Sequence, residues 1–303
     1  MPQRKNEATS LHGFLIIDKP AGWTSHDVVA RVRRLIGERH VGHAGTLDPA
    51  ATGVLPIAIG HATKSLEYLS GASKTYRAEI TFGVETDSYD ADGQVTQQRD
   101  AYHLTASEVE AALTAFRGQI EQIPPMHSAL KIGGKKLYEL ARAGETVERA
   151  ARAVEIYSLI LMNWSSPTAT VAIDCSKGTY VRSLARDVGK RMGTGAYLSD
   201  LVRLRTGPFF LCEALTLGDL EERDVRMAWS DVAIHPDAAV LDLPVLLLDE
   251  DATTRWDSGR SIAGRPHQDG RARVYNAQGD WAGIAAFDTV SSQWRPQKVI
   301  VSA

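Results

Sequence analysis

Hydrophobic and polar positions repeat with two distinct periods along the chain. A period of two, in which alternate side chains face opposite sides, predicts half-buried strands over 74–83 and 168–176. Short continuous apolar runs predict buried strands at the start of 13–25 and over 54–60, and the first run ends in a turn that contains Pro and Gly. These strands alternate with helical segments, so the pattern predicts a mixed α/β protein.

Helical spacing begins at residues that commonly cap helices. Ser25 is expected to cap a helix that ends at Gly37, because apolar residues recur every three or four positions between them. Thr105 and Glu108 have the spacing of a capping box, and Gly118 is a plausible end for that helix. Further short helices are expected over 62–69, 135–144 and 177–193.

The pattern changes after Pro244. Short apolar segments separated by glycine turns replace the longer elements, which predicts a small all-β domain at the end of the chain. The length of 303 residues agrees with two domains, since domains commonly contain about 100–200 residues.

Charge is unevenly distributed. The formal net charge is -3, so any nucleic-acid binding would need a local basic surface. From Lys177 to Phe209 the chain holds seven basic residues against two acidic ones, which predicts such a surface there. The basic residues are Lys177, Arg182, Arg186, Lys190, Arg191, Arg203 and Arg205.

Targeting and redox signals point to the cytoplasm. Cys175 and Cys212 have no metal-binding or disulfide-type spacing, and Cys175 is expected to be a buried free thiol. The chain has no apolar run of about 18 residues, so no membrane span is expected. The N-terminal MPQRKNEATS lacks the apolar centre of a secretion signal.

Several common catalytic motifs are absent from the sequence: GxGxxG, GxxxxGK[ST], HExxH and GxSxG. Asp87, Asp90 and Asp92 resemble a cation loop, but the downstream glutamate of an EF-hand is missing, so a polar turn is favoured over a metal site. No metal ligands are predicted.

Asp48 lies in GHAGTLDPAATGVLP (42–56), a loop of small and stiff residues with no second acid beside it. A turn residue or a helix cap is the ordinary interpretation of such an acid. A glycoside hydrolase would normally pair two carboxylates. Arg182, on the predicted helix 177–193, could supply a counter-ion.

Five segments, in order, resemble the motifs of the TruB family of pseudouridine synthases. They are DKPAGWTS (18–25), GHAGTLDPAATGVLPIAIGHATK (42–64), KTYRAEITFG (74–83), IPPMHSALKIGGKKLYELAR (123–142) and CSKGTYVRSLARD (175–187). Two departures stand out: Ala50 replaces a common leucine, and His127 replaces a common tyrosine. These departures bear on packing or RNA contact rather than on the chemistry.

The resemblance implies a fold and an activity. The fold would be the pseudouridine synthase core with a largely antiparallel central sheet over 11–240, followed by a small PUA-like RNA-binding β domain over 245–303. The enzyme would isomerise uridine at position 55 in the TΨC loop of tRNA, without a cofactor, a membrane or an obligatory protein partner. Asp48 would be the catalytic residue, and both a nucleophilic and a glycal route remain open.

The resemblance also assigns supporting roles. Arg182 would pair with Asp48 and hold the pKa of that carboxyl low. Tyr76 would stack on the target uracil and assist proton removal from C5, although alternation alone favours a core aromatic. His43 would fill the space left by extruded nucleotides. Residues expected to support the pocket or contact phosphates are Lys19, Lys64 and Tyr180, and Leu201 would form an apolar wall.

Three alternative functions remain open from the sequence. The first is an RNA-binding protein or RNA chaperone that keeps the fold without catalysis. The second is a glycosidase-like enzyme that releases free uracil. The third is a guide-RNA-dependent enzyme similar to dyskerin, against which the short chain without long basic tails favours a stand-alone bacterial enzyme. Whether a loop around 124–152 closes on RNA is also open.

Overall fold

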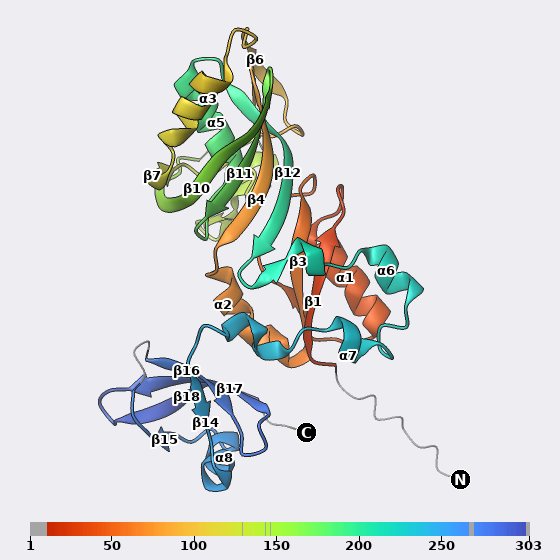
Figure 1. The fold of residues 1–303 in the computed structure, drawn as a ribbon, viewed down its shortest axis with the longest axis vertical. Coiled ribbons are helices and arrows are strands. Elements are labelled where there is room, and N and C mark those ends of the chain that lie inside the picture. Colours follow the sequence, from red (N-terminus) through yellow and green to blue (C-terminus); the bar gives the residue numbers. More distant parts are fainter. Residues whose placement is uncertain (1–10, 129, 143, 146, 267–269, 301–303) are drawn as a thin grey trace.

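The computed structural model describes residues 11–300 apart from 129, 143, 146 and 267–269. The N-terminal segment MPQRKNEATS and residues 301–303 of the expected second domain therefore lie outside the described residues. A long sheet runs through the upper and middle parts of the molecule, and a separate small sheet lies at the lower end (Figure 1). The protein is thus a mixed α/β protein with a C-terminal β domain, as predicted.

The central sheet contains nine strands, and the main order is β1-β3-β12-β4-β11-β10-β7. Its β12–β3 pair is parallel and its other pairs are antiparallel, which confirms the largely antiparallel sheet. The strands are β1 (Gly13–Lys19), β2 (Val41–His43), β3 (Thr52–Ile59), β4 (Lys74–Phe82), β7 (Gly118–Gln122), β10 (Arg152–Ser165), β11 (Thr168–Cys175), β12 (Ala196–Thr206) and β13 (Phe209–Phe210).

Helices and short hairpins surround this sheet. The helices are α1 (Ser25–Ile36), η1 (Gly60–Ser65), α2 (Leu66–Ser70), α3 (Ala106–Thr114), α4 (Leu137–Arg142), α5 (Val181–Met192), η2 (Leu211–Glu213), α6 (Leu217–Glu222), α7 (Trp229–Val232) and η3 (Pro236–Val240). Two hairpins are formed by β5 (Val84–Thr86) with β6 (Val95–Gln98) and by β8 (Lys131–Ile132) with β9 (Lys135–Lys136). Figure 1 shows α1 beside the β1 end of the sheet, and α3 and α5 beside the β10 end.

The helix ends confirm some predictions and correct others. Gly37 ends α1 with a left-handed φ of 67°. The N-cap of α1 is Thr24 rather than Ser25, because the Thr24 hydroxyl accepts from the backbone N–H of Asp27. The predicted capping box of α3 is present, but α3 ends at Thr114, and Gly118 begins β7 instead of ending the helix.

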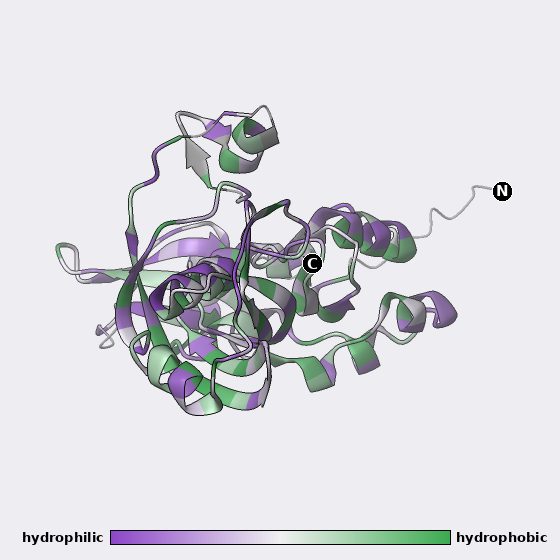
Figure 2. Ribbon diagram, turned by 90° about the horizontal axis from the view of Figure 1, so that it is seen from above, coloured by the Kyte–Doolittle hydropathy of each residue, from purple (hydrophilic) through white to green (hydrophobic). Residues whose placement is uncertain are grey.

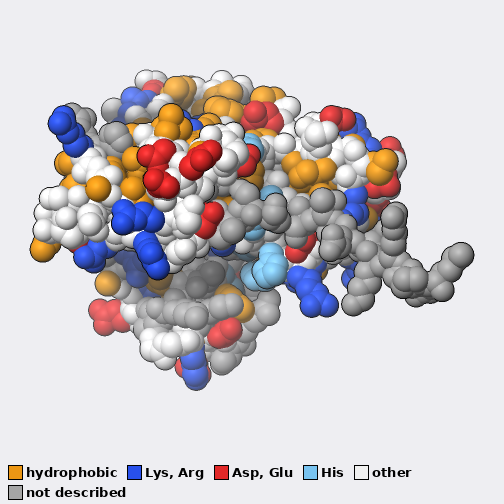
Figure 3. Space-filling view, turned by 90° about the horizontal axis from the view of Figure 1, so that it is seen from below, with side chains coloured by type: hydrophobic (Ala, Val, Ile, Leu, Met, Phe, Trp, Pro, Cys, Tyr) orange, Lys and Arg blue, Asp and Glu red, His pale blue; other side chains and the backbone are white. Residues whose placement is uncertain are grey.

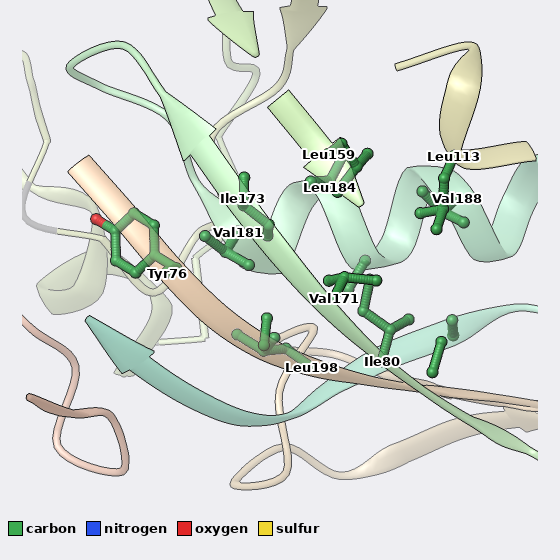
Figure 4. Packing of buried hydrophobic residues seen from close by; sticks show 14 of the residues in the cluster. Tyr76, Ile80, Leu113, Leu159, Val171, Ile173, Val181, Leu184, Val188 and Leu198 are labelled. Atoms are coloured by element: carbon green, nitrogen blue, oxygen red, sulfur yellow. The ribbon is translucent and has the colours of Figure 1, made fainter. Parts of the chain in front are cut away.

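The main core lies between α5, α3 and one face of the sheet (Figure 4). The apolar stripe of α5 is buried, including Leu184 and Val188, which face Val171 and Ile173 of β11. Tyr76 of β4 lies at one end of this cluster, with its hydroxyl pointing away from the aliphatic side chains. Cys175 is a buried free thiol, as predicted.

The C-terminal β domain has a five-stranded sheet and one helix. The strand order is β14-β16-β17-β18-β15. Its elements are β14 (Val245–Leu247), α8 (Glu250–Asp257), β15 (Ile262–Ala263), β16 (Arg271–Tyr275), β17 (Trp281–Asp288) and β18 (Gln293–Val299).

The two sheets share buried side chains. Trp281 and Ile284 of β17 belong to the same hydrophobic cluster as Phe14 of β1 and Phe209 of β13. The linking helix η3 contributes three buried residues to this cluster. The C-terminal β domain is therefore packed against the nine-stranded sheet.

The surface is mixed in character. Figure 2, a view along the long axis, shows hydrophobic and hydrophilic positions alternating on the strands and helices. The end face in Figure 3 shows Lys and Arg side chains dispersed among acidic and hydrophobic ones. Among the described residues, no helix is both long enough and apolar enough to cross a membrane.

Candidate active site

A cavity of about 330 Å³ brings together five of the predicted site residues, which come from four separate segments of the chain. Arg203 of β12 and Lys74 of β4 line it as well, although neither was predicted to belong to the site. The five predicted residues are Asp48, Tyr76, Tyr180, Arg182 and Leu201.

The loop that carries Asp48 is fixed from both sides. The Ser25 hydroxyl accepts from the Leu47 N–H at 2.9 Å, which ties the loop to the start of α1. Behind the acid, the Lys19 ammonium donates to the carbonyl of Pro49 at 3.0 Å. Gly53 has a φ of 97°, and a Cβ atom there would lie 2.2 Å from a backbone oxygen of β12, so only glycine fits.

Arg182 joins Asp48 to a second carboxylate. One guanidinium nitrogen of Arg182 lies 3.0 Å from Oδ1 of Asp48, and the other lies 3.1 Å from Oδ2 of Asp90. The first nitrogen also donates to the carbonyl of His127 at 2.7 Å. The arginine is buried, so its fork geometry is held by these partners.

Asp90 is a further site residue that sequence reasoning missed, beside Arg203 and Lys74. It was grouped with Asp87 and Asp92 as part of a polar turn. The three acids do lie in a turn, and Asp87 accepts from the backbone of Gln94 at 2.9 Å. Tyr89, which precedes Asp90, has a left-handed φ of 66°, and this uncommon conformation directs Asp90 toward α5.

The pKa of Asp48 departs from expectation. Burial of the loop raises the pKa of Asp48, and the adjacent Arg182 guanidinium opposes this rise without cancelling it. Asp90 adds to the rise because it places a second negative charge nearby. Arg182 therefore pairs with Asp48 and acts on its pKa in the expected direction, but desolvation of the carboxyl outweighs this effect.

Tyr76, Leu201 and Tyr180 form the apolar and aromatic part of the cavity wall. Tyr76 is 8% exposed, and burial raises the pKa of its phenol, while Arg203 opposes the rise. Leu201 is buried on β12. Tyr180 caps α5, and its backbone exchanges hydrogen bonds with the Gln122 side chain at 3.0 and 3.3 Å.

Lys19, His43 and Lys64 lie outside the cavity lining. The fully buried ammonium of Lys19 donates to three carbonyl oxygens, including that of Pro49, and burial lowers its pKa to about 8. Burial lowers the pKa of His43 to about 4, so its imidazole is neutral at pH 7. Lys64 is exposed and donates to the carbonyl of Val299 at 2.6 Å. Contact of these three residues with RNA stays a prediction.

The predicted basic surface over 177–209 is only partly exposed. Arg182 and Arg203 are buried, while Arg205 pairs with Asp174 at 2.8 Å and Arg186 pairs with Asp187 at 2.7 Å. The count of charges along the sequence could not distinguish these residues from solvated ones. The exposed basic residues of this segment are Lys177, Lys190 and Arg191.

In the part of the chain that the structure describes, no group of three or more His, Cys, Asp or Glu side chains is arranged to hold a metal ion. The aspartate-rich turn instead satisfies its own backbone: Asp90 accepts from the Ser88 hydroxyl and from the N–H of Asp92. The groups that line the cavity offer the chemistry of one carboxylate, two phenols, one ammonium and two buried guanidinium groups.

Comparisons with known proteins identify the family of this chain. The family model described as TruB family pseudouridylate synthase (N terminal domain) matches residues 33–181, and the tRNA pseudouridylate synthase B C-terminal domain matches 182–241. The chain is 44% identical over 296 residues to tRNA pseudouridine synthase B of Dehalococcoides mccartyi, covering 96% of this chain and 97% of that protein. It is 50% identical over 259 residues to tRNA pseudouridine synthase B of Symbiobacterium thermophilum, covering 84% and 85%.

A solved structure of an H/ACA RNP bound to a substrate RNA containing 2'-deoxyuridine has the same fold. Its TM-score is 0.72 at 22% sequence identity, and the match covers 96% of this chain and 85% of that one. The matched family models and the relatives define a pseudouridine synthase, which is an isomerase. The chain belongs to the TruB family of these enzymes, which confirms the resemblance.

Proposed function

We propose that this enzyme converts uridine at position 55 in the TΨC loop of tRNA to pseudouridine, with Asp48 as its catalytic carboxylate. The observation that carries the proposal is the Asp48 carboxylate, held at 3.0 Å by Arg182 in a cavity that Tyr76 and Leu201 also line. The names of the relatives, tRNA pseudouridine synthase B, support tRNA as the substrate.

The reaction requires that one bond break and another form on the same base. The N1–C1′ bond breaks, the uracil turns within the cavity, and C5 bonds to C1′. The proton on C5 then leaves, and N1 takes up a proton, so no atom is gained or lost and no cofactor is required. One carboxylate suffices, because the base stays in the cavity throughout. Asp48 acts in its ionised form whether it attacks carbon or takes a sugar proton.

The target base must leave its stack to reach Asp48. Extrusion of a nucleotide costs a few kcal/mol, which stacking and a closed pocket can offset. Tyr76 and Leu201 are suited to enclose the uracil ring, and Tyr180 lies at the edge of the same cavity. Single-stranded loops of RNA are recognised by their shape and by bases that have left the stack. A protein site formed from several loops is compatible with such a substrate.

The remaining site predictions divide into two groups. Of the two roles expected of Lys19, the enclosed ammonium favours support of the Asp48 loop over direct contact with phosphate. His43 and Lys64 are proposed to contact tRNA. We also propose that the chain divides into a catalytic domain over 11–240 and a PUA-like RNA-binding domain over 245–303. The enzyme would act in the cytoplasm, on the T-arm of tRNA, without an obligatory protein partner.

Mass-resolved mapping of pseudouridine in unmodified tRNA, after incubation with the purified protein alone, tests this function. Pseudouridine at position 55 supports the proposal. Release of free uracil would favour the glycosidase-like alternative. Binding without any change in the RNA would favour the non-catalytic one, and a requirement for an added guide RNA would favour the dyskerin-like one.

A further inference from the structure

Ser128 carries a buried hydroxyl that has no partner within the described structure. The residue is 5% exposed, and its Oγ atom forms no hydrogen bond with any of the residues that the structure describes. Buried hydroxyls are nearly always hydrogen-bonded, because an unpaired one has left water without compensation. An orphan hydroxyl in the wall of an active-site cavity is therefore a candidate for contact with the substrate.

The backbone of Ser128 is fixed on both sides, which also fixes the direction of its Cα–Cβ bond. Its N–H donates to the carbonyl of Met126 at 2.9 Å, and its carbonyl accepts from the N–H of Tyr138 at 3.1 Å. The carbonyl of the preceding residue, His127, accepts from the guanidinium of Arg182 at 2.7 Å. Ser128 is thereby tied to the arginine of the candidate active site.

Ser128 lies where two cavities meet. It lines the 330 Å³ cavity that also contains Tyr76 and Leu201, and it lines a second cavity of about 680 Å³. Asp48 and Arg182 line both cavities as well. The two cavities therefore share the wall at which the proposed reaction takes place.

The second cavity is acidic, which argues against a phosphate at the shared wall. Asp87, Asp90 and Asp92 line it together with Asp48. Arg182 lines it too, but this cation is already paired with Asp48 and Asp90. A phosphate placed there would meet charges of its own sign, whereas a neutral hydroxyl would not.

The proposed placement of the nucleotide leaves the ribose at this shared wall. The uracil lies on the side of Tyr76 and Leu201, and C1′ lies at Asp48. The 2′-hydroxyl is bonded to the carbon next to C1′, and it is the one free hydroxyl of a nucleotide inside an RNA strand. Like the hydroxyl of serine, it can both donate and accept a hydrogen bond.

We propose that the Ser128 hydroxyl binds the 2′-hydroxyl of the target uridine and so contributes to the selection of ribose over deoxyribose at that nucleotide. The 2′-hydroxyl is the group by which proteins distinguish RNA from DNA at a given site. The contact orients the sugar against Asp48 and takes no part in the making or breaking of bonds. The inference rests on the proposed function, because it assumes that the target uridine enters this cavity.

The test is a double-mutant cycle on binding. A T-arm hairpin carries either uridine or 2′-deoxyuridine at the target position, and the protein is Asp48→Asn with or without Ser128→Ala, so that the hairpin binds without reacting. Loss of the serine hydroxyl should weaken binding of the uridine hairpin about 2- to 10-fold, the scale of one neutral hydrogen bond. The affinity for the deoxyuridine hairpin should not change.

Ser70→Ala is the matched control. Ser70 lines the 330 Å³ cavity too, but its hydroxyl already donates to the carbonyl of Leu66 at 3.1 Å. This substitution should leave the ratio of the two affinities as it is in Asp48→Asn alone. An equal change of that ratio in Ser70→Ala would overturn the proposal, because the effect would not be specific to Ser128.

Two further results of the cycle would overturn the proposal. Equal weakening of both hairpins by Ser128→Ala would place the hydroxyl against another part of the RNA. Unchanged affinity for both would show that the hydroxyl makes no contact with the target nucleotide. An uncoupled cycle, in a protein whose wild type isomerises the hairpin, rejects only the role of Ser128, whereas absence of isomerisation in wild type rejects the proposed function.

Two measurements cover a variant that fails to bind or to fold. With Asp48 intact, Ser128→Ala should raise the uridine-hairpin concentration for half-maximal single-turnover rate by the same factor, and should leave inhibition by the deoxyuridine hairpin unchanged. Because the hydroxyl has no partner among the described residues, Ser128→Ala should not lower the melting temperature without RNA. A lower melting temperature would show that the hydroxyl is bonded within the protein, and would overturn the proposal.

Discussion

A guanidinium nitrogen of Arg182 lies 3.0 Å from Oδ1 of Asp48, although 134 residues separate the two along the chain. The loop between β2 and β3 provides the acid, and the first turn of α5 provides the arginine. Because Asp90 and the carbonyl of His127 occupy the other donors of the same guanidinium, its direction is fixed. The site therefore depends on three loops that meet at the start of one helix.

Replacement of Asp48 by Asn should remove turnover and preserve RNA binding. Asparagine keeps the size of the side chain but can neither act as a nucleophile nor take a proton. We expect the rate to fall by about 10³-fold or more, the scale on which loss of a group that acts in the chemical step is felt. Pseudouridine mapping and filter binding measure the two properties. Turnover near the wild-type rate in Asp48→Asn would contradict the assignment.

The same variant should not be less stable than wild type. The pKa of Asp48 is raised in the folded state, so that state binds the proton more tightly than the unfolded chain does. The ionised carboxylate therefore lowers stability above the folded pKa, and acidification through that pKa relieves the loss. The asparagine side chain of Asp48→Asn is neutral at every pH, so thermal melting of this variant at pH 7 should give an equal or higher midpoint.

Arg182→Lys should slow catalysis more than it weakens RNA binding. A single ammonium cannot span Asp48 on one side and Asp90 on the other, so the acid loses its fixed direction. We expect the rate at saturating RNA to fall at least about 10-fold. Arg186→Lys, one turn further along α5, is the matched control because its partner is Asp187. Equal rate losses in Arg182→Lys and Arg186→Lys would show that Arg182 contributes only positive charge and does not fix the direction of Asp48.

Asp90→Asn should resemble a weaker form of the Arg182 substitution. Asparagine can still accept a hydrogen bond from the guanidinium, but the charge that anchors its other arm is lost. We expect a rate loss between that of Asp92→Asn, an exposed neighbour used as control, and that of Arg182→Lys. Single-turnover rates on the same tRNA decide the order. An Asp90→Asn enzyme as fast as Asp92→Asn would show that one anchor on Arg182 is enough.

The acid limb of the pH–rate profile should lie above the range of an ordinary aspartate. Asp48 must be ionised to act, so the rate falls as pH drops through its folded pKa, which burial raises above the usual value of about 3.9. His43 also titrates at low pH, since its pKa is about 4. A His43→Asn variant with the same midpoint would assign the limb to Asp48, whereas a displaced midpoint would assign it to the histidine.

Local sequence signals were sufficient for features that depend on neighbouring residues. The glycine that ends α1 and the capping box of α3 act over one helical turn, and both were predicted correctly. The grouping of Asp48, Tyr76 and Arg182 in one cavity followed from the order of the family motifs rather than from spacing, because no pattern within a segment reports which loops meet.

Features that depend on distant partners were missed. Nothing in the turn that contains Asp90 distinguishes it from Asp87, because its partner Arg182 lies 92 residues away. Arg203 was counted as surface charge, although β12 lies between β3 and β4 and three strands enclose it. Lys19 was expected to support the pocket or contact phosphate. Its burial was missed because it depends on the three carbonyl oxygens that accept hydrogen bonds from its ammonium.

The C-terminal β domain should stabilise the catalytic part directly. The sequence predicted a small all-β domain at the end of the chain. In the structure, Trp281 and Ile284 lie in one buried cluster with Phe14 and Phe209 of the catalytic sheet. Truncation would expose that cluster, so the shortened protein should melt at a lower temperature than the full chain. It should also lose turnover on a T-arm hairpin on warming, although truncation removes none of the proposed catalytic groups.

Trp281→Ala tests the same point without truncation. Loss of a large buried aromatic commonly costs about 3–5 kcal/mol, and here the cost falls on a cluster that both sheets share. Trp294→Ala is the matched control because Trp294 is buried in a separate cluster inside the C-terminal β domain. Turnover on the hairpin after brief heating should be lost at a lower temperature in Trp281→Ala than in Trp294→Ala. If both variants keep the heat resistance of wild type on the hairpin, the activity of the central sheet does not depend on the shared cluster.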